Sequence, residues 1–400
     1  MAESCKASDG SDMWTFGLDT KWTILLGGKA QVLERVAIDQ KEYKGKRRGS
    51  DDWENVESCA TGKANNGEKA DKEWDGIVGF FHPFCNAGGG GERVLWAAIL
   101  ATQKRWPNAK CIVYTGDHDV DKPQIISRVK DRFNIQLHPP TITFLYLTTR
   151  HWVLASTWPH FTLLGQSIGS LILAWDAFSL VVPDIFVDTM GYAFALGFSK
   201  ILFPEVPTGA YVHYPTISTD MLGSLDPTSA TGNQGVNAGK VSAMTLIQKR
   251  VYQLRLLANE LHIKDDVEFH LDAPWPKILE WLGKASVGVN GMWNEHFGIG
   301  VVEYQAAGLI SVVHDSGGPK RDIVTEVGGL ATGFHASTSE QFAQGFESAL
   351  SLPREDKIAM RLRARKSAQR FTEAEFAKKW IVGMEELVLL RRKWEGIRSQ

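Results

Sequence analysis

Two acidic residues eight positions apart, Glu295 and Glu303, lie in the stretch GMWNEHFGIGVVEYQAAG and are the strongest candidates for chemistry in this sequence. The residue pattern predicts a strand, ASVGVN, then a loop with Glu295 and a helix with Glu303. Carboxylates so placed can accept hydrogen bonds from the vicinal hydroxyls of a sugar or ribose. The helix dipole also favours acids near a helix N-terminus, so simple capping is the alternative. The flanking Trp293, Gly298 and Gly300 favour a binding site.

Four consecutive glycines, Gly88, Gly89, Gly90 and Gly91, follow the predicted strand IVGFF and begin a predicted helix. Glycine lets backbone N–H groups approach an anion, and the helix N-terminus adds the positive end of its dipole. The pattern is neither GxGxxG nor a P-loop, because no GK[ST] follows. A tight turn needs only one or two glycines, so we predict contact with a phosphate or an acceptor.

Two further polar sites follow predicted strands. His213 ends GAYVHY, so we expect its side chain to point into a ligand crevice; a core position is the alternative. The stretch HDSGGPKRDIV holds a second glycine turn. Gly317 and Gly318 can present backbone amides, and Lys320 can serve as a point charge toward phosphate. A plain loop with a solvated lysine is the alternative there.

A metal site is the competing hypothesis. Asp117, Asp119 and Asp121 lie in GDHDVDKP after a predicted strand, and an Asp-x-Asp pair there could bind a divalent metal that bridges a diphosphate. Acidic turns after strands are common, so we expect no metal. The four cysteines are widely spaced, without a CxxC pair, so we predict free thiols in a reducing compartment.

The remaining sequence predicts elements that could position these residues. The 400 residues suffice for two domains, and the net charge of −2 gives no indication of nucleic-acid binding. Residues 1–73 are polar and aperiodic, so we predict disorder. Strands and helices alternate from Trp74 onward, which favours parallel sheets covered by helices. The apolar segment 161–182 predicts a buried helix, with a membrane-surface segment as the alternative, and no transmembrane helix is predicted.

Several of these motifs resemble one known family. FFHPFCNAGGGGERVLW, FTLLGQSIGSLILAWDAF, VHYPTISTDML and MWNEHFGIGVVEYQAAG…HDSGGPKRDIV closely resemble the α-1,2-mannosyltransferases that extend the lipid-linked oligosaccharide of asparagine-linked glycosylation. The spacing from Glu295 to Glu303 matches the E-x7-E signature of retaining glycosyltransferases. The resemblance covers roughly residues 74–222 and 245–390, and residues 1–73 resemble nothing in the family.

The resemblance implies an α/β fold of the GT-B class, with two Rossmann-like domains facing a crevice. Residues 74–222 would form the acceptor-side domain, and residues 242–400 the donor-binding domain with a helical tail. The implied reaction is retaining transfer of mannose from GDP-mannose, without a metal or cofactor, to dolichol-diphosphate-linked Man3GlcNAc2 and Man4GlcNAc2. The implied location is the cytosolic face of the endoplasmic reticulum membrane, with the membrane surface and other cytosolic-face mannosyltransferases as partners.

The resemblance also implies a role for each motif. His213 would touch the donor sugar near the reacting carbon, and Glu295 would contact the transferred mannose. Glu303 would hold the donor ribose. The four glycines would line the donor diphosphate and the acceptor side. The other implied donor-binding residues are Phe297, Gly298, Gly317, Gly318 and Lys320.

One segment departs from the family pattern. Residues 223–241, GSLDPTSATGNQGVNAGKV, stand where the family has a strand and a G-x-F-R-P-E-K-type loop whose Arg and Lys clamp the diphosphate. We therefore predict a linker in place of a missing block, and an incomplete second domain. Our hypothesis is a shortened enzyme that arose by alternative splicing or a wrong exon boundary. A non-catalytic member that only binds lipid-linked sugar or a partner is the alternative, and another two-domain transferase, such as a disaccharide synthase, is less favoured.

Overall fold

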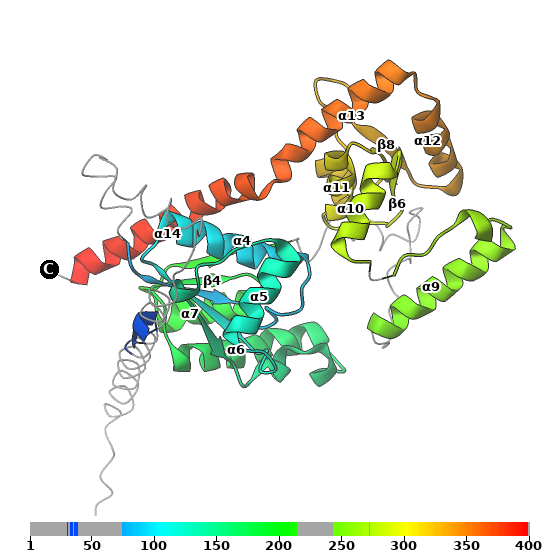
Figure 1. Ribbon diagram of the computed structural model, residues 1–400. Coiled ribbons are helices and arrows are strands. Elements are labelled where there is room, and N and C mark those ends of the chain that lie inside the picture. The colour runs from blue at the N-terminus through cyan, green and yellow to red at the C-terminus, as the bar shows by residue number, and fades with distance from the viewer. Residues whose placement is uncertain are drawn as a thin grey trace, which may run out of the picture. The chain divides into compact units, whose positions relative to one another are not determined.

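The computed structural model describes residues 30, 33–34, 36–38, 74–213, 243–271 and 273–398. These residues belong to two compact units (Figure 1). Unit 1 comprises residues up to His213 together with Glu373 and the residues after it. Unit 2 comprises the described residues from 243 to Thr372. Each unit is an α/β layer structure with a parallel sheet, as the alternation of strands and helices predicted.

Unit 1 is built on a five-stranded parallel sheet with the strand order β3-β2-β1-β4-β5. The chain fills one side of β1 first and then crosses to its other side to add β4 and β5. The junction between β1 and β4 is therefore the topological switch point, where open α/β sheets bind ligands at the carboxyl ends of their strands. The strands are β1 (Ile77–Phe81), β2 (Lys110–Thr115), β3 (Ile142–Tyr146), β4 (Ile185–Asp188) and β5 (Thr208–Ala210).

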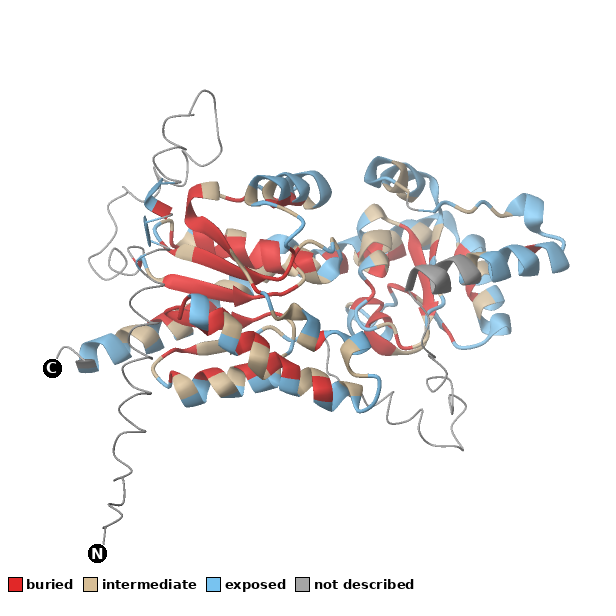
Figure 2. Ribbon diagram, turned by 90° about the horizontal axis from the view of Figure 1, so that it is seen from below, coloured by how far each residue is buried: buried red, intermediate tan, exposed pale blue. Residues whose placement is uncertain are grey.

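Helices cover both faces of this sheet, and the alternation of side chains along β1 explains how. Val78 and Phe80 pack with α4 (Gly90–Arg105), α5 (Lys122–Phe133) and α14 (Glu373–Arg398). Ile77 and Phe81 pack on the opposite face with α6 (Thr162–Leu180) and α7 (Ala193–Leu202). Figure 2 shows the sheet of unit 1 as a continuous buried layer between exposed helix surfaces. A fully buried sheet of this kind fits its runs of apolar residues.

The last helix, α14, belongs to unit 1, whereas the sequence placed it as the tail of the second domain. Its buried Met384 and Val388 join the core on the α4 face. Arg391 forms a largely buried ion pair with Asp184 (2.8 Å), and Glu385 accepts a hydrogen bond from Arg105 (2.9 Å). The helix is long and mostly polar, so its few apolar side chains were too weak a signal to assign it to either sheet.

Unit 2 contains a three-stranded parallel sheet among its described residues, with the order β6-β7-β8. Its strands are β6 (Val287–Asn290), β7 (Ile310–His314) and β8 (Gly333–Ala336). The helices are α9 (Ala243–Glu260), α10 (Trp275–Lys284), α11 (Ile299–Ala307), α12 (Ser339–Ser351) and α13 (Arg354–Ala368). Short helical turns occur at Pro139–Thr141, Arg150–Val153, Ala155–Thr157, Lys264–Asp266, Pro319–Ile323 and Gln369–Phe371.

The core of unit 2 is small among the residues that the structure describes. The central strand β7 is buried from Ile310 to Val313, whereas Val289 of the flanking strand β6 is 43% exposed. Apolar side chains of α9 and α10 also lie at the surface, including Tyr252, Leu257 and Trp275. Parallel sheets normally have both faces and both edges protected, and the described residues of unit 2 leave these side chains exposed.

Several predicted elements were wrong in detail. VEFHL (267–271) is not a strand, because no neighbouring strand pairs with it among the described residues. In the segment predicted to be disordered, positions 30–38 include helical residues, and Val36 is buried in the core on the α6 face. The rest of residues 1–73, and all of 214–242, lie outside the described residues.

Helix α6 was predicted to be buried, but only one side of it is. Leu173, Ala174 and Phe178 pack on the sheet, while Leu163 is 69% and Leu164 55% exposed. Of the helices described, α6 is the one long and apolar enough to span a membrane by length and composition.

Candidate functional site

The first cluster of polar side chains lies at the switch point of unit 1. His82 follows β1 directly, and Thr189 follows β4 directly. Because β1 and β4 are paired in parallel, their carboxyl ends meet. His82 Nδ1 lies 2.7 Å from Thr189 Oγ1, and both residues are completely buried. The glycine turn follows β1 and His213 follows β5, so the two predicted sites of unit 1 come to the same edge of the sheet.

The glycine turn has a distinct requirement at each of its positions. Gly88 has φ +79°, and a Cβ there would lie 2.8 Å from the guanidinium of Arg132. Gly89 is the N-cap of α4, and its N–H donates to Glu92 Oε2 (2.5 Å). Gly90 has open space around its Cα. The structure therefore explains Gly88 by backbone conformation, while Gly90 is open to approach by a ligand.

Gly91 and His213 are neighbours. A Cβ on Gly91 would be 3.6 Å from His213 Cε1, which is ordinary van der Waals contact. His213 is exposed, and its Nε2 lies 3.0 Å from the carbonyl oxygen of Thr189. Because a carbonyl only accepts, Nε2 must carry the proton. His213 was expected to end a strand, but β5 stops at Ala210, and the hydrogen bond to Thr189 now positions the imidazole.

Asp117 and Asp121 have structural partners, contrary to the metal hypothesis. Asp117 is ion-paired with Arg150 and accepts a hydrogen bond from the backbone N–H of Asn86 (2.9 Å), just before the glycine turn. Asp121 is the N-cap of α5, where it accepts from the N–H of Gln124. In the described part of the chain no three His, Cys, Asp or Glu side chains are grouped to hold a metal ion. The absence of a metal stays a prediction.

In unit 2, Glu295 and Glu303 lie where the pattern predicted them. Glu295 is in the loop after β6, and Glu303 is in the second turn of α11; both side chains are half-buried. The hydroxyl of Tyr304 donates to the Val289 carbonyl oxygen (3.3 Å), which ties α11 to β6. Burial, with a contribution from the charge of Glu303, raises the pKa of Tyr304. Tyr304 therefore keeps its proton, which lets its hydroxyl donate this hydrogen bond.

The second glycine turn supports the Glu295 loop, whereas a phosphate-binding turn was predicted. The N–H of Gly318 donates to the carbonyl oxygen of Glu295 (2.9 Å), so it is not available to an anion. A Cβ at Gly318 would lie 2.5 Å from the carbonyl oxygens of His296 and Phe297, and one at Gly317 would strike that of Glu295. Glycine is needed here because two backbones touch. The sequence pattern could not distinguish this close packing from ligand approach.

The other donor-side residues are also held within unit 2. Gly298 is the N-cap of α11 with φ +89°, and a Cβ there would lie 2.9 Å from Pro319 Cγ, so both conformation and space require glycine. Phe297 packs edge-on against Phe371, with ring centroids 5.4 Å apart. Lys320 forms an ion pair with Asp315 (3.0 Å) in an exposed setting. Lys320 therefore has a carboxylate partner, which the prediction of a free point charge did not anticipate.

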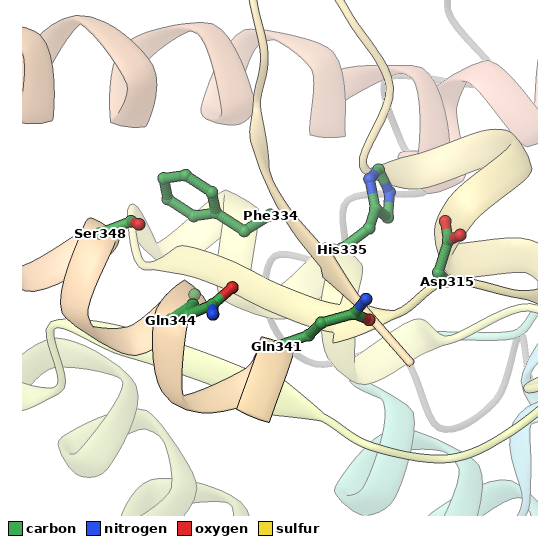
Figure 3. Close-up of a pocket in the computed structure, with 7 residues that line it drawn as sticks. Asp315, Phe334, His335, Gln341, Gln344 and Ser348 are labelled. Carbon is green, nitrogen blue, oxygen red and sulfur yellow. The ribbon is translucent and has the colours of Figure 1, made fainter. Parts of the chain in front are cut away.

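A shallow cavity of about 360 Å³ lies next to this region, at the end of β7 (Figure 3). Asp315 borders it after β7, Phe334 and His335 contribute from β8, and α12 contributes Gln341, Gln344, Gly345 and Ser348. Burial lowers the pKa of His335, with an opposing effect from the charge of Asp315. None of the predicted site residues lines this cavity, although Asp315, the ion-pair partner of Lys320, does.

Sequence reasoning missed His82, Glu92, Asp188 and Thr189. Asp188 is buried and accepts hydrogen bonds from the N–H groups of Met190 (3.0 Å), Gly191 (2.8 Å) and Tyr192 (2.6 Å), so it fixes the turn after β4. Burial raises the pKa of Asp188, and these backbone hydrogen bonds oppose the rise. A usable signal was present, since polar residues directly after adjacent parallel strands are expected at a switch point.

Comparison with known proteins agrees with this arrangement. The family model described as ALG11 mannosyltransferase N-terminus matches residues 75–261, and the model described as glycosyl transferases group 1 matches residues 236–371. A GDP-Man:Man(3)GlcNAc(2)-PP-Dol alpha-1,2-mannosyltransferase of Neurospora crassa is 52% identical, covering 91% of this chain and 90% of that protein. The Homo sapiens protein of that name is 34% identical, covering 78% and 87%. A solved glycosyltransferase of Rickettsia africae matches the fold at 12% identity, with a TM-score of 0.50 over 78% of this chain and 99% of that one.

The matches also bear on chain length. The alignment with the Neurospora protein spans 505 residues, although this chain has only 400, so positions inside the alignment have no counterpart here. That residues 223–241 replace a block of the family stays a prediction. The match covers 91% of the chain, so it extends into residues 1–73, which we had placed outside the resemblance.

Two parallel α/β units, with a glycine turn at the switch point of the first and an E-x7-E loop in the second, define a glycosyltransferase of the GT-B class. Within that class, the family models and the relatives specify one group. The chain belongs to the ALG11 mannosyltransferase family.

Proposed function

We propose that this protein transfers mannose, in α-1,2 linkage, from GDP-mannose to dolichol-diphosphate-linked Man3GlcNAc2 and then to the Man4GlcNAc2 product. The observation that carries the proposal is the 52% identity to a relative named for this reaction, over 90% of that relative. The glycine turn and His213, adjacent at the switch point, support it because they supply an open backbone and an imidazole at one sheet edge.

We assign the chemical roles as follows. His213 acts on the transferred sugar near the reacting carbon, and Glu295 accepts hydrogen bonds from the hydroxyls of that mannose. Glu303 binds the donor ribose, because vicinal hydroxyls donate well to a carboxylate. The glycine turn receives phosphate or acceptor at the N-terminus of α4. The reaction retains the anomeric configuration and needs no metal, so positioning and fixed dipoles must stabilise the oxocarbenium-like sugar.

The proposed location is the cytosolic face of the endoplasmic reticulum membrane, where the lipid-linked acceptor is anchored. The exposed apolar side chains of α6, of its N-cap residue Phe161 and of α7 support contact with a lipid surface. Phe161 is 85% and Ile201 80% exposed, and Trp175 is 52% exposed. Exposed apolar patches can mark contact with a membrane or a partner. Association with other mannosyltransferases of that face belongs to the same proposal.

Mannose transfer by the full chain is the direct test. The chain would be incubated with GDP-mannose and a trimannosyl lipid-diphosphate acceptor, and products one and two mannoses longer would be measured. Glu295→Ala is expected to lower the rate at least about tenfold, because a transition-state hydrogen bond to a charged group is lost. Glu340→Ala, which changes an exposed acid on α12, is the matched control and keeps the wild-type rate.

The same assay separates the enzyme from the shortened non-catalytic alternative. A folded wild-type chain that binds the lipid-linked acceptor but forms no product would support the alternative and overturn the proposal. Adding the residues that the relative has and this chain lacks would then show whether the missing block carries the diphosphate clamp.

A further inference from the structure

A buried polar path connects the glycine turn to His213 within unit 1. We define this path as Glu92, His82 and Thr189. Glu92 Oε2 accepts from the N–H of Gly89 (2.5 Å), and Glu92 Oε1 lies 3.9 Å from His82 Nε2. His82 Nδ1 contacts Thr189 Oγ1 (2.7 Å), and the Thr189 carbonyl oxygen contacts His213 Nε2 (3.0 Å). The three members are at most 8% exposed, while both ends of the path reach the candidate site.

The hydrogen-bond directions along the path are determined by its acceptors. The Thr189 hydroxyl lies 3.3 Å from the Phe81 carbonyl oxygen and donates to it. It must therefore accept from His82, which places a proton on His82 Nδ1. At the far end, the Thr189 carbonyl requires a proton on His213 Nε2. The Nδ1 atom of His213 is then the ring nitrogen with a lone pair, so the path selects the tautomer of the exposed imidazole.

The Glu92 end of the path is also fixed. Glu92 is the third residue of α4 and forms a capping interaction with Gly89. Burial alone would raise the pKa of Glu92, but the neighbouring His82 and the N–H groups of Glu92 and Gly89 outweigh burial and lower it. A charged carboxylate therefore lies under the glycine turn, facing His82 Nε2, which has no hydrogen-bond partner among the described residues. A buried ring nitrogen without a hydrogen bond costs folding free energy. Such a nitrogen in a native structure calls for an explanation other than stability.

We propose that His82 and Glu92 are positioning residues for mannose transfer. Glu92 fixes the backbone of the glycine turn, and His82, through Thr189, fixes the orientation and tautomer of His213. The turn after β1 and the imidazole after β5 are thereby held as one rigid group. This inference rests on the proposed function, because it assigns the path to the reaction in which His213 acts.

A double-mutant cycle tests whether His82 acts through His213. His82→Leu is expected to lower kcat about 10- to 100-fold with little change in KM, because a misplaced group loses most of its effect. In a His213→Ala background the same change should lower kcat no more than about twofold. His82→Asn keeps a donor at the place of Nδ1 and should recover most of the rate. Multiplicative effects of the two changes would overturn the inference.

The control is Gln103→Met on α4, the helix that carries Glu92. Gln103 is buried and donates to the His138 carbonyl oxygen (2.9 Å), away from the path. This variant should lose stability while kcat per folded molecule stays at the wild-type value. If Gln103→Met lowers kcat as much as His82→Leu does, the path has only a general structural role and the inference fails.

Nitrogen NMR of the histidine rings gives a readout that does not depend on activity. The His213 signals, assigned by their loss in His213→Ala, should show a protonated Nε2 in the wild-type chain and in His82→Asn. They should show a mixture of tautomers in His82→Leu and Glu92→Ala. An unchanged tautomer in both of these variants would overturn the inference. A chain that transfers no mannose but shows the tautomer change would instead contradict the proposed function alone.

Discussion

At the residue scale, glycine is used for three different physical reasons in this protein. Gly88 supplies a left-handed backbone conformation, Gly318 lets two loops touch, and Gly90 leaves space in front of a helix N-terminus. Only the third use is available to a ligand. The sequence shows the same letter in all three cases. Ligand contact at the run of four glycines therefore stays a prediction, which the open space at Gly90 allows, whereas the N–H of Gly318 is engaged by the Glu295 carbonyl oxygen.

We expect Gly88→Ala to destabilise unit 1 by about 1–2 kcal/mol, because alanine resists the left-handed conformation. Gly90→Ala is the matched control. Gly90 is the first residue of α4, with nothing near its Cα, and alanine favours a helix, so stability should stay equal or rise slightly. Urea unfolding of the two variants would measure the difference. Equal losses in both would contradict this reading of the turn.

At the element scale, the strands of unit 1 were predictable and the side chains behind the site were not. IVGFF, CIVY and TITFLYL are short apolar runs that could only be buried strands, and each corresponds to a strand of the sheet. His82 and Thr189 come next to such strands, yet their pairing depends on β1 and β4 being neighbours. That adjacency arises from a crossover of more than 100 residues, which local patterns do not encode.

Helix α14 is tied to unit 1 by charge as well as by apolar contact. Arg391→Met should cost about 3 kcal/mol, because Asp184 would be left buried without its cation. Glu395 is a second partner of Arg391, and the Glu395 side chain is 52% exposed. Glu395→Gln should therefore cost less than about 0.5 kcal/mol of folding stability. Chemical denaturation followed by tryptophan fluorescence would compare them. A similar small cost for both changes would mean that the α14 ion pair contributes little.

The apolar surface of α6 makes a separate prediction. Phe161→Asp with Leu163→Asp should lower binding to phosphatidylcholine–phosphatidylserine vesicles at least about tenfold in a sedimentation assay, because two exposed apolar anchors are lost. The control replaces Leu350 and Leu362, two apolar residues of unit 2 that are each 59% exposed, and should bind as the wild-type chain does. Binding that is insensitive to the α6 changes would remove this face as a membrane contact.

At the scale of the whole molecule, the two units differ in how much apolar surface they bury. Unit 1 has large clusters on both faces of its sheet, whereas those of unit 2 are small and its strand β6 is partly exposed. The resemblance predicted an incomplete second domain from residues 223–241, whereas periodicity alone indicated two ordinary domains; the incompleteness stays a prediction. Composition could not have shown it, because each remaining strand and helix is normal in itself.

Amide hydrogen exchange should therefore be faster in β6 and β7 than in β1 and β2, because local opening is easier where fewer apolar contacts must break. Mass spectrometry of peptides that cover Val287–His314 and Ile77–Thr115 would measure both in one experiment. Equal protection would indicate that unit 2 is as stable as unit 1 despite its small core.

The position of α14 in the chain has a consequence for biosynthesis. Unit 1 acquires Trp380, Met384 and Val388 only after all of unit 2 has been translated. At the usual pace of several residues per second, the nascent sheet would wait for tens of seconds with part of its α4 face uncovered. The first unit to be synthesised is thus the last to be completed. During that interval the apolar surface on its α4 face is exposed, and a chaperone could bind it.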